Sequence, residues 1–397
     1  MSAVLKKAAD FARRETVLLA AMGLAAVSAV FVPPSRAYAE YIDFRTLGLL
    51  FSLMAVTEGC RRMGIFERAA GLLTRSARTH FQLVLALTAA CFFASMAITN
   101  DVALITFVPL SLAALSRLEG GARLAIPVTV MQTIAANLGS MLTPIGNPQN
   151  LYLYGLSGMR VGGFIKLMLP YTLLAGAMLA GWAYMLCRKK GALSALPAQD
   201  MPTDNTDLPE IHRGRLAMYA ALFALCLLTV ARVLPWQVAA AAALICTLAA
   251  DRAVLKNIDW SLLLTFCGFF IFIGNVSAVP AFSGALRRFI GGRELFTAAA
   301  ESADVCADYR RQGCMASQII SNVPCAILLS AFTDNVRALI VGTNIGGLGT
   351  LIASMASLIS YKQICREKPA EKGRYLACFT AANAVFLLAM AVLAIIL

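Results

Sequence analysis

The sequence predicts an all-α polytopic membrane protein with two inverted-topology repeats, each containing a re-entrant helical hairpin and a discontinuous transmembrane helix. Of its 397 residues, 59% are hydrophobic and 14% are charged, whereas soluble domains carry roughly 25% charged residues. Polar or helix-breaking residues interrupt long apolar runs, and similar interruptions recur in both halves. So much apolar surface cannot be buried in one water-soluble core, so we expect most of the chain to lie in a lipid bilayer.

The net charge of +13 arises from basic residues clustered between the apolar runs. Such clusters orient membrane proteins by staying in the cytoplasm, so we do not expect a nucleic-acid partner. Residues 1–40 hold basic residues, the apolar run 17–32 and then Ala37-Tyr38-Ala39. This order fits an N-terminal transmembrane helix or a signal peptide, and the length of the run favours an uncleaved helix. In both cases the N-terminus is expected in the cytoplasm.

Residues 81–116 form an apolar run whose one charge is Asp101, near its middle. The run is too long for one helix and too short for two crossings with a turn, because a span needs about 20 residues. Basic residues flank it on both sides, so both ends should face the cytoplasm. We therefore expect a re-entrant hairpin with Thr99-Asn100-Asp101 at its tip, enclosed by protein or water.

A second unusual run covers residues 124–159. Its segment 143–150 contains two prolines and a glycine within five consecutive positions. These residues break a helix, and the backbone groups that they free must face a cavity and not lipid. The second half repeats the pattern, with an expected hairpin at 312–333 that enters from outside and an expected break at 342–350.

The two halves match in three places, taken in the same order along the chain. The matched segments are 43–47 with 259–263, 99–100 with 321–322, and 136–140 with 343–347. We expect repeat 1 at 41–187, a cytoplasmic linker at 188–215, and repeat 2 with its preceding scaffold helices at 216–397. The first hairpin enters from the inside and the second from the outside, an arrangement found in secondary transporters whose sites lie at the repeat interface.

Polar residues at the tips and breaks are the candidate ligands, because asparagine can both accept and donate and helix ends add partial charges. The candidate substrate-binding residues are Thr99, Asn100, Asn147, Ser321, Asn322, Thr343 and Asn344. The candidate ion-binding residues, which would also be the positions of a bound Na⁺, are Asn100, Asp101, Thr143, Gly146, Asn150, Asn322, Gly342 and Asn344. Asp101 would bind a cation or a proton, or it caps the following helix.

Sequence motifs for cofactor or nucleotide chemistry are missing from the chain. We find no GxGxxG, P-loop, HExxH or GxSxG motif and no Cys/His metal spacing. We therefore expect neither an enzyme nor a bound cofactor. Since nothing indicates ATP hydrolysis, uphill transport would use a Na⁺ or H⁺ gradient.

The segment Ala136–Tyr152, ANLGSMLTPIGNPQNLY, resembles the broken-helix signature of the ion transporter superfamily. This superfamily includes divalent anion–sodium symporters, citrate transporters and arsenite permeases, and the resemblance covers nearly all of the chain from about residue 40. The tips at 99–101 and 321–323 are similar to the Ser-Asn-Thr tips of the dicarboxylate branch. They differ at the third position in both repeats and at the first position in repeat one, and the first tip is closer to the arsenite-permease pattern. The resemblance implies a homodimer with scaffold and transport regions and an elevator-like motion.

These observations predict a secondary active transporter in the cytoplasmic membrane. It would move a small anion, similar to a di- or tricarboxylate, with Na⁺ or H⁺ as the coupling ion. The alternative within the same superfamily is efflux of arsenite or another inorganic anion, or sodium/proton exchange. A passive channel is the alternative from another class, and counterflow in proteoliposomes distinguishes it from a carrier.

Overall fold

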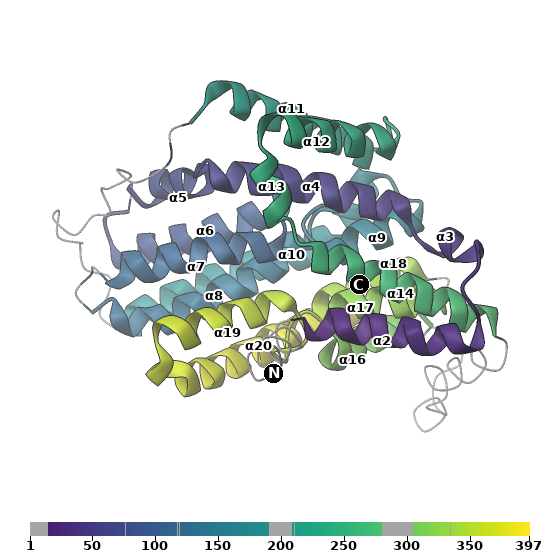
Figure 1. The fold of residues 1–397 in the computed structure, drawn as a ribbon. Coiled ribbons are helices and arrows are strands. Elements are labelled where there is room, and N and C mark those ends of the chain that lie inside the picture. The colour runs from purple at the N-terminus through teal and green to yellow at the C-terminus, as the bar shows by residue number, and fades with distance from the viewer. Residues whose placement is uncertain are drawn as a thin grey trace, which may run out of the picture.

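Every long regular element in the described part of the computed structural model is a helix (Figure 1). The structure describes residues 15–189, 209, 211–279 and 305–397, apart from residues 76, 117, 119 and 334. Much of the expected linker 188–215, and residues 280–304 before the second hairpin, lie outside the described residues. Five of the described helices are long and apolar enough to cross a membrane: His80–Ala97, Val161–Arg188, Arg213–Val230, Trp260–Ala278 and Pro369–Ile396. The fold is therefore that of an all-α polytopic membrane protein.

The first half of the chain contains a long run of helices before the linker. They are α2 (Thr16–Phe31), α3 (Ala37–Tyr41), α4 (Phe44–Arg62), α5 (Ile65–Arg75), α6 (His80–Ala97), α7 (Asn100–Ser116), α8 (Ala122–Ser140), α9 (Pro148–Ser157) and α10 (Val161–Lys189). The second half adds α11 (Arg213–Val230), α12 (Trp236–Ala250), α13 (Arg252–Asn257), α14 (Trp260–Ala278), α16 (Val305–Ile320), α17 (Asn322–Ser330), α18 (Val336–Ile345), α19 (Met355–Glu367) and α20 (Lys372–Ile396).

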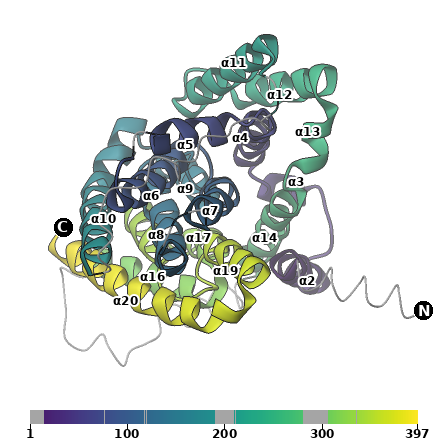
Figure 2. The same ribbon diagram turned by 90° about the vertical axis from the view of Figure 1, so that its left-hand side faces the viewer.

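The helices pack as two groups, which Figure 2 shows in a view along much of the bundle. In the first group, α4 packs against α11, α12 and α13, and α2 packs along α14. We call α2, α4 and α11–α14 the arc. In the second group, α6 and α7 pack on α8, while α16 and α17 pack on α18. We call α6–α10 and α16–α20 the hairpin group.

Equivalent N-caps begin α4 and α14, at the first of the three matched segments. The Asp43 carboxylate accepts a hydrogen bond from the Thr46 amide over 3.1 Å. The Asp259 carboxylate accepts one from the Leu262 amide over 2.9 Å. An N-cap carboxylate satisfies an amide that the helix leaves free, so the sequence match reflects a shared structural role.

Two helical hairpins occur where the sequence predicts them. The α6–α7 pair turns at Ile98-Thr99, and the α16–α17 pair turns at Ser321. The first arm of the second hairpin begins at Val305, however, and not at residue 312 as predicted. The polar residues at the start of α16 do not read as membrane-embedded sequence, which is why the apolar pattern placed the boundary too late.

Both discontinuous helices are present, but each break is displaced from its predicted position. The first break covers residues 141–147, and Pro148 to Asn150 form the start of α9. Proline fits the first turn of a helix, where its missing N–H is not needed. The second break covers residues 346–354, while residues 342–345 remain helical in α18. The opposite orientation of the two halves across a membrane stays a prediction.

Glycines at equivalent positions bring each hairpin close to its own broken helix. A Cβ atom on Gly139 would lie 2.2 Å from the Phe92 carbonyl oxygen, and one on Gly346 would lie 2.8 Å from the Cys314 Cα atom. The two glycines are 346 − 139 = 207 residues apart, the same offset as the third pair of matched segments. Only a residue without a side chain permits this approach. Each of these glycines therefore fixes the position of one hairpin against its broken helix.

Candidate functional site

Each hairpin tip is joined to the break of its own repeat by the same backbone hydrogen bond. The Asn100 amide donates to the Gly146 carbonyl over 3.2 Å, and the Asn322 amide donates to the Ala353 carbonyl over 3.0 Å. The tips are 322 − 100 = 222 residues apart and the acceptors 353 − 146 = 207 residues apart. These offsets equal those of the matched segments, so the two halves build their tips in the same way.

The tip asparagines use their side-chain oxygens to cap the helices that they begin. Asn100 Oδ1 accepts from the Asp101 amide over 2.9 Å, and Asn322 Oδ1 accepts from the Val323 amide over 3.0 Å. Both asparagines are buried. Their side-chain amides remain to donate elsewhere, and Asn100 Nδ2 donates to Asn137 Oδ1 over 3.1 Å.

Asn137 connects the first tip to the second break, although the two segments are more than two hundred residues apart. Its side-chain oxygen accepts from Ser354 Oγ over 2.9 Å as well as from Asn100. Its amide donates to the Gly347 carbonyl over 3.4 Å. Sequence reasoning did not select Asn137 or Ser354. The usable signal for Asn137 was its match with Asn344 in the third pair of segments.

A second link joins the two broken helices directly. Asn344 Nδ2 donates to Asn150 Oδ1 over 2.6 Å. Asn150 Nδ2 in turn lies 3.4 Å from the Ser140 carbonyl and 3.3 Å from the Thr143 carbonyl. The tips and breaks of both repeats therefore form one buried polar network.

Several buried polar atoms of the broken helices have no hydrogen-bond partner among the described residues. They are Asn147 Oδ1, Gln149 Nε2 and Asn344 Oδ1. Leaving a buried polar atom unpaired costs about 1–3 kcal/mol, and such atoms often indicate a missing ion, water or ligand. Two acceptors and one donor are thus available to a solute or a cation.

The second tip is held in an unusual backbone conformation. Ser321 has φ 70° and ψ 157°, a region that is essentially reserved for glycine. Its side chain is buried, and its hydroxyl lies 3.4 Å from Asn322 Oδ1. Strain of this kind persists only where the surrounding contacts impose it, and it is frequent at ligand sites.

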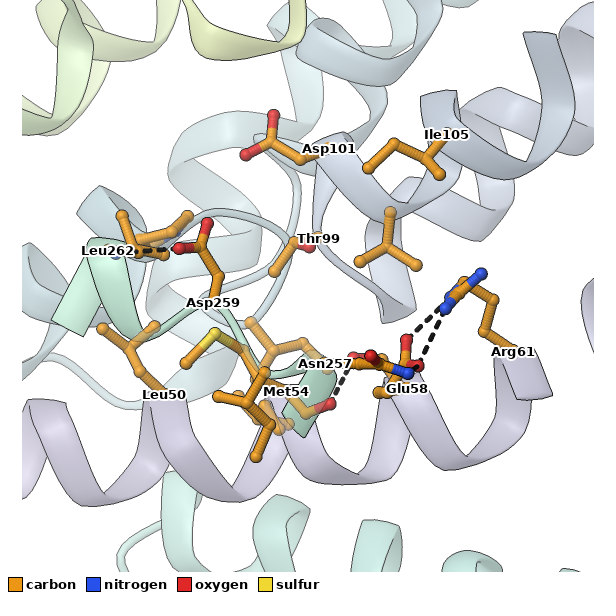
Figure 3. A pocket seen from close by; sticks show the side chains of 16 residues that line it. Leu50, Met54, Glu58, Arg61, Thr99, Asp101, Ile105, Asn257, Asp259 and Leu262 are labelled. Atoms are coloured by element: carbon orange, nitrogen blue, oxygen red, sulfur yellow. Dashed lines mark hydrogen bonds and ion pairs between the residues drawn. The ribbon is translucent and has the colours of Figure 1, made fainter. Parts of the chain in front are cut away.

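A pocket of about 270 Å³ lies between the arc and the first hairpin tip (Figure 3). Its walls come from α4, the first tip, the first break and the α13–α14 junction. They are formed by Leu50, Leu53, Met54, Thr57, Glu58, Arg61, Thr99, Asp101, Val102, Ile105, Ile145, Pro148, Asn257, Ile258, Asp259 and Leu262. The pocket therefore adjoins the polar network at the boundary between the two helix groups.

The charged residues of this pocket are mostly acidic. Arg61 is its one basic lining residue among those described, and it is held by Glu58 through contacts of 2.7 and 2.8 Å. Asn257 donates to the same carboxylate over 2.9 Å. Asp259 and Asp101 add two further carboxyl groups, and Asp101 Oδ1 is buried with no partner in the described structure.

The remaining predicted site residues are placed less favourably for a ligand. The Thr343 hydroxyl donates to the Leu339 carbonyl of its own helix over 2.8 Å. The Gly342 carbonyl accepts from the Gly346 amide over 2.8 Å, and its Cα faces α16. In the first break, the Thr143 hydroxyl donates to the Met96 carbonyl. The Gly146 carbonyl is occupied by the Asn100 amide.

Relatives of the chain are membrane proteins and transporters. The chain is 32% identical over 356 residues to the "Inner membrane protein YbiR" of Escherichia coli strain K12, covering 88% of this chain and 86% of that one. It is 37% identical over 148 residues to the "Silicon efflux transporter LSI3" of Oryza sativa subsp. japonica, covering 36% of this chain and 28% of that one.

The fold has a solved counterpart, and the sequence matches a family model. The YdaH transporter of Alcanivorax borkumensis superposes with a TM-score of 0.60 at 15% identity, covering 95% of this chain and 96% of that chain. The model of the family described as "Citrate transporter" matches residues 4–340. The chain is therefore a multi-pass membrane protein that belongs to the citrate transporter family.

Proposed function

We propose that the protein is a secondary active carrier of the cytoplasmic membrane, with its N-terminus in the cytoplasm, that moves a small solute through the pocket beside the first hairpin tip. The observation that carries this proposal is the convergence of both tips and both breaks in one buried network with unpaired polar atoms. In lipid, such irregular backbone is tolerated only where it is enclosed by protein or lines a cavity. The name of the YbiR relative supports the inner membrane as the location.

The charge of the pocket favours a small uncharged or weakly acidic solute over a di- or tricarboxylate. Glu58, Asp101 and Asp259 line the pocket together with one arginine, Arg61, which already has Glu58 as its carboxylate partner. At an effective dielectric constant of about 20, two like charges 4 Å apart repel by about 4 kcal/mol. A citrate trianion would meet this repulsion, whereas an undissociated inorganic acid such as arsenous or silicic acid would not. The name of the LSI3 relative is in keeping with this choice.

Helix dipoles do not reverse that preference. The helices α7, α9, α17 and α19 begin near the site, while α6, α8, α16 and α18 end there. Helix N-termini carry about +0.5 charge and C-termini about −0.5, so the two sets offset one another. A carboxylate solute remains the second candidate, because the family is described by citrate.

The coupling species in this proposal is a proton taken up by Asp101. A buried carboxylate oxygen without a hydrogen bond is costly when charged, and protonation or a bound cation relieves that cost. Asp101 also borders both helix groups, since it lies on α7 and lines the pocket with α4 and α14 residues. Proton uptake at this position would therefore change the charge of the surface along which the groups would move in an elevator-type mechanism. A homodimer, in which the arc would be the fixed part, is proposed with it.

Counterflow in proteoliposomes tests the proposal. Purified protein is reconstituted, preloaded with unlabelled arsenite, silicic acid, citrate or succinate, and assayed for uptake of the labelled solute with imposed pH or Na⁺ gradients. Asn100→Ala and Asn322→Ala should each abolish exchange, whereas Asn275→Ala, a buried asparagine in α14 away from the tips, should retain it. Wild-type exchange by both tip variants would exclude the site, and flux without counterflow would indicate a channel.

A further inference from the structure

The second break depends on one glutamine of the hairpin that packs beside it. The Gly346 and Leu348 residues are buried beyond the end of α18, where carbonyl groups lose their helical partners. Gln318, on α16, donates from Nε2 to the Gly346 carbonyl over 2.8 Å and to the Leu348 carbonyl over 2.7 Å. Nε2 also lies 3.3 Å from the Cys314 carbonyl of its own helix. An amide nitrogen has two N–H donors, and the two shorter contacts are those to the break.

The other end of the same amide is also engaged. Gln318 Oε1 accepts from the Thr350 amide over 2.9 Å, and the Gln318 backbone carbonyl accepts from the Thr350 hydroxyl over 3.0 Å. The side chain thus bonds to both sides of the turn in the break. The Asn322 amide reaches the Ala353 carbonyl in the same break, so the shape of the break also sets the position of the second tip.

The glycine between these contacts leaves room for the Gln318 side chain. Gly349 has φ +106°, and a Cβ atom on it would lie 2.2 Å from Gln318 Oε1. An L-residue is strained at this φ whatever the space around it. Both the backbone conformation and the contact with the Gln318 amide therefore require glycine at position 349.

The first repeat lacks this arrangement. The position equivalent to Gln318 is 318 − 222 = 96, which is occupied by Met96. Met96 contributes its backbone carbonyl, which accepts from Thr143, and the first break is stabilised from within by Asn150. The hydrogen bonds of the Gln318 side chain to the break, which we call the clamp, are therefore a property of the second repeat. Unpaired oxygens occur in both repeats, at Asn147 and Asp101 in the first and at Asn344 in the second.

We propose that Gln318 is a positioning residue that holds the second break in the shape required for solute binding. Its NH₂ group does there what a bound cation would do, because it draws two carbonyl oxygens together around a positively polarised group. A cation at that place would compete with the amide for the same oxygens. The proposal rests on the proposed carrier function, and it places no ion at the Gly346 and Leu348 carbonyls, which the Gln318 amide already occupies.

Two variants of Gln318 test the assignment in counterflow. Gln318→Ala should raise the KM for the solute about tenfold, equivalent to about 1.4 kcal/mol, since the Gly346 and Leu348 carbonyls both lose their donor. Gln318→Glu cannot donate to the carbonyls when ionised but can when protonated. Its exchange rate relative to wild type should therefore fall at high pH and recover at low pH. A side chain that only fills space would show no such pH dependence.

Hydrogen–deuterium exchange provides a readout that does not depend on transport. In Gln318→Ala, and in Gly349→Ala where Gln318 itself is kept, amides of residues 346–354 should exchange about tenfold faster than in wild type. Gln363→Ala is the matched control, because its amide donates to Glu367 on the same helix. If the break is protected equally in all variants and the KM and pH profile are unchanged, Gln318 has no positioning role. If wild type itself lacks counterflow, the carrier proposal fails while the exchange data still decide the clamp.

Discussion

Asn344 donates its side-chain amide to Asn150 Oδ1 over 2.6 Å, and the two residues are 194 positions apart in the chain. Each lies on a different discontinuous helix, Asn150 in α9 and Asn344 in α18. Asn150 also donates to the Ser140 carbonyl at the end of α8 and to the Thr143 carbonyl in the break that follows. This pair is therefore one of the direct side-chain bonds by which one broken helix supports the other.

The Asn150–Asn344 pair should behave as a coupled unit. Asn150→Ala and Asn344→Ala should each lower the free energy of unfolding by about 1–3 kcal/mol, because each leaves buried partners unpaired. The double variant should cost less than the sum of the single variants, with a coupling energy of about 0.5–3 kcal/mol. Chemical unfolding in detergent measures the cycle. Strict additivity would show that the contact contributes nothing.

Asp101→Asn should uncouple solute exchange from the proton gradient. The amide is neutral at every pH, so the variant resembles a permanently protonated carboxyl group, and its buried oxygen no longer carries the cost of a charge. We expect counterflow to persist, with a flatter pH dependence, while accumulation driven by a pH gradient is lost. Uptake by wild type and variant at matched gradients is the measurement, and retained accumulation in the variant would remove Asp101 from the coupling.

Much of the candidate site could be predicted from local sequence, because an unpaired polar backbone group in lipid costs several kcal/mol. Two polar tips and two breaks within apolar runs indicated hairpins and discontinuous helices, and the structure contains all four. The breaks themselves were placed several residues away from their positions. Pro148 is favourable at the start of α9, and the asparagine and threonine at 343–344 are tolerated within α18 because their side chains bond to carbonyls of the same helix.

The contacts between the halves could not be predicted, since no periodic pattern records them. Ser354 and Gln318 are ordinary polar residues in sequence, and their roles depend on partners in other elements. Arg232 lies between two apolar runs, and the sequence indicates no partner for it. In the structure its guanidinium lies over the Tyr154 ring, with 5.3 Å between the guanidinium carbon and the ring centroid. Such long-range contacts appear only when the chain has folded.

Gly139→Ala and Gly346→Ala should destabilise the protein to a similar degree. An added methyl group at either position meets the backbone of the first arm of its hairpin, and overpacking of this kind costs about 1–3 kcal/mol. Gly181→Ala in α10 is the control, because nothing lies within 4 Å of its Cβ position. Melting temperatures of the three variants are the measurement. An unchanged melting temperature in both test variants would contradict the close approach of each hairpin to its glycine.

Arg232 should hold the arc and the hairpin group together, through hydrogen bonds that we call the clasp. It lies at the end of α11, and its guanidinium donates to the carbonyls of Tyr154, Gly155 and Gly158 over 3.3, 3.5 and 3.4 Å. Its φ of 65° would suit glycine better. Arg232→Gly should therefore leave the turn intact but release α9, and an arginine at a helix C-terminus contributes about 0.3–1 kcal/mol.

We expect Arg232→Gly to change the counterflow rate up to about fivefold if release of the clasp accompanies transport. Arg232→Lys should resemble the glycine variant, because an ammonium group cannot reach three carbonyls in the planar geometry of a guanidinium. Arg374→Ala is the control, since that arginine pairs with Glu371 on the surface. Equal rates in all variants would restrict Arg232 to a local structural role.

The N-terminal helix should remain in the mature protein. Asn275 Nδ2 on α14 donates to Ser28 Oγ over 3.0 Å and to the Tyr38 hydroxyl over 2.9 Å. Gly268 on the same helix faces Ala21, with no room for a side chain. Cleavage after Ala39 would expose Asn275 to lipid, where a polar group without a partner costs several kcal/mol. Intact mass spectrometry should therefore detect the full chain, and a chain lacking residues 2–39 should melt at a lower temperature. Detection of a mature N-terminus at Glu40, with unchanged stability, would show that α2 is a signal peptide.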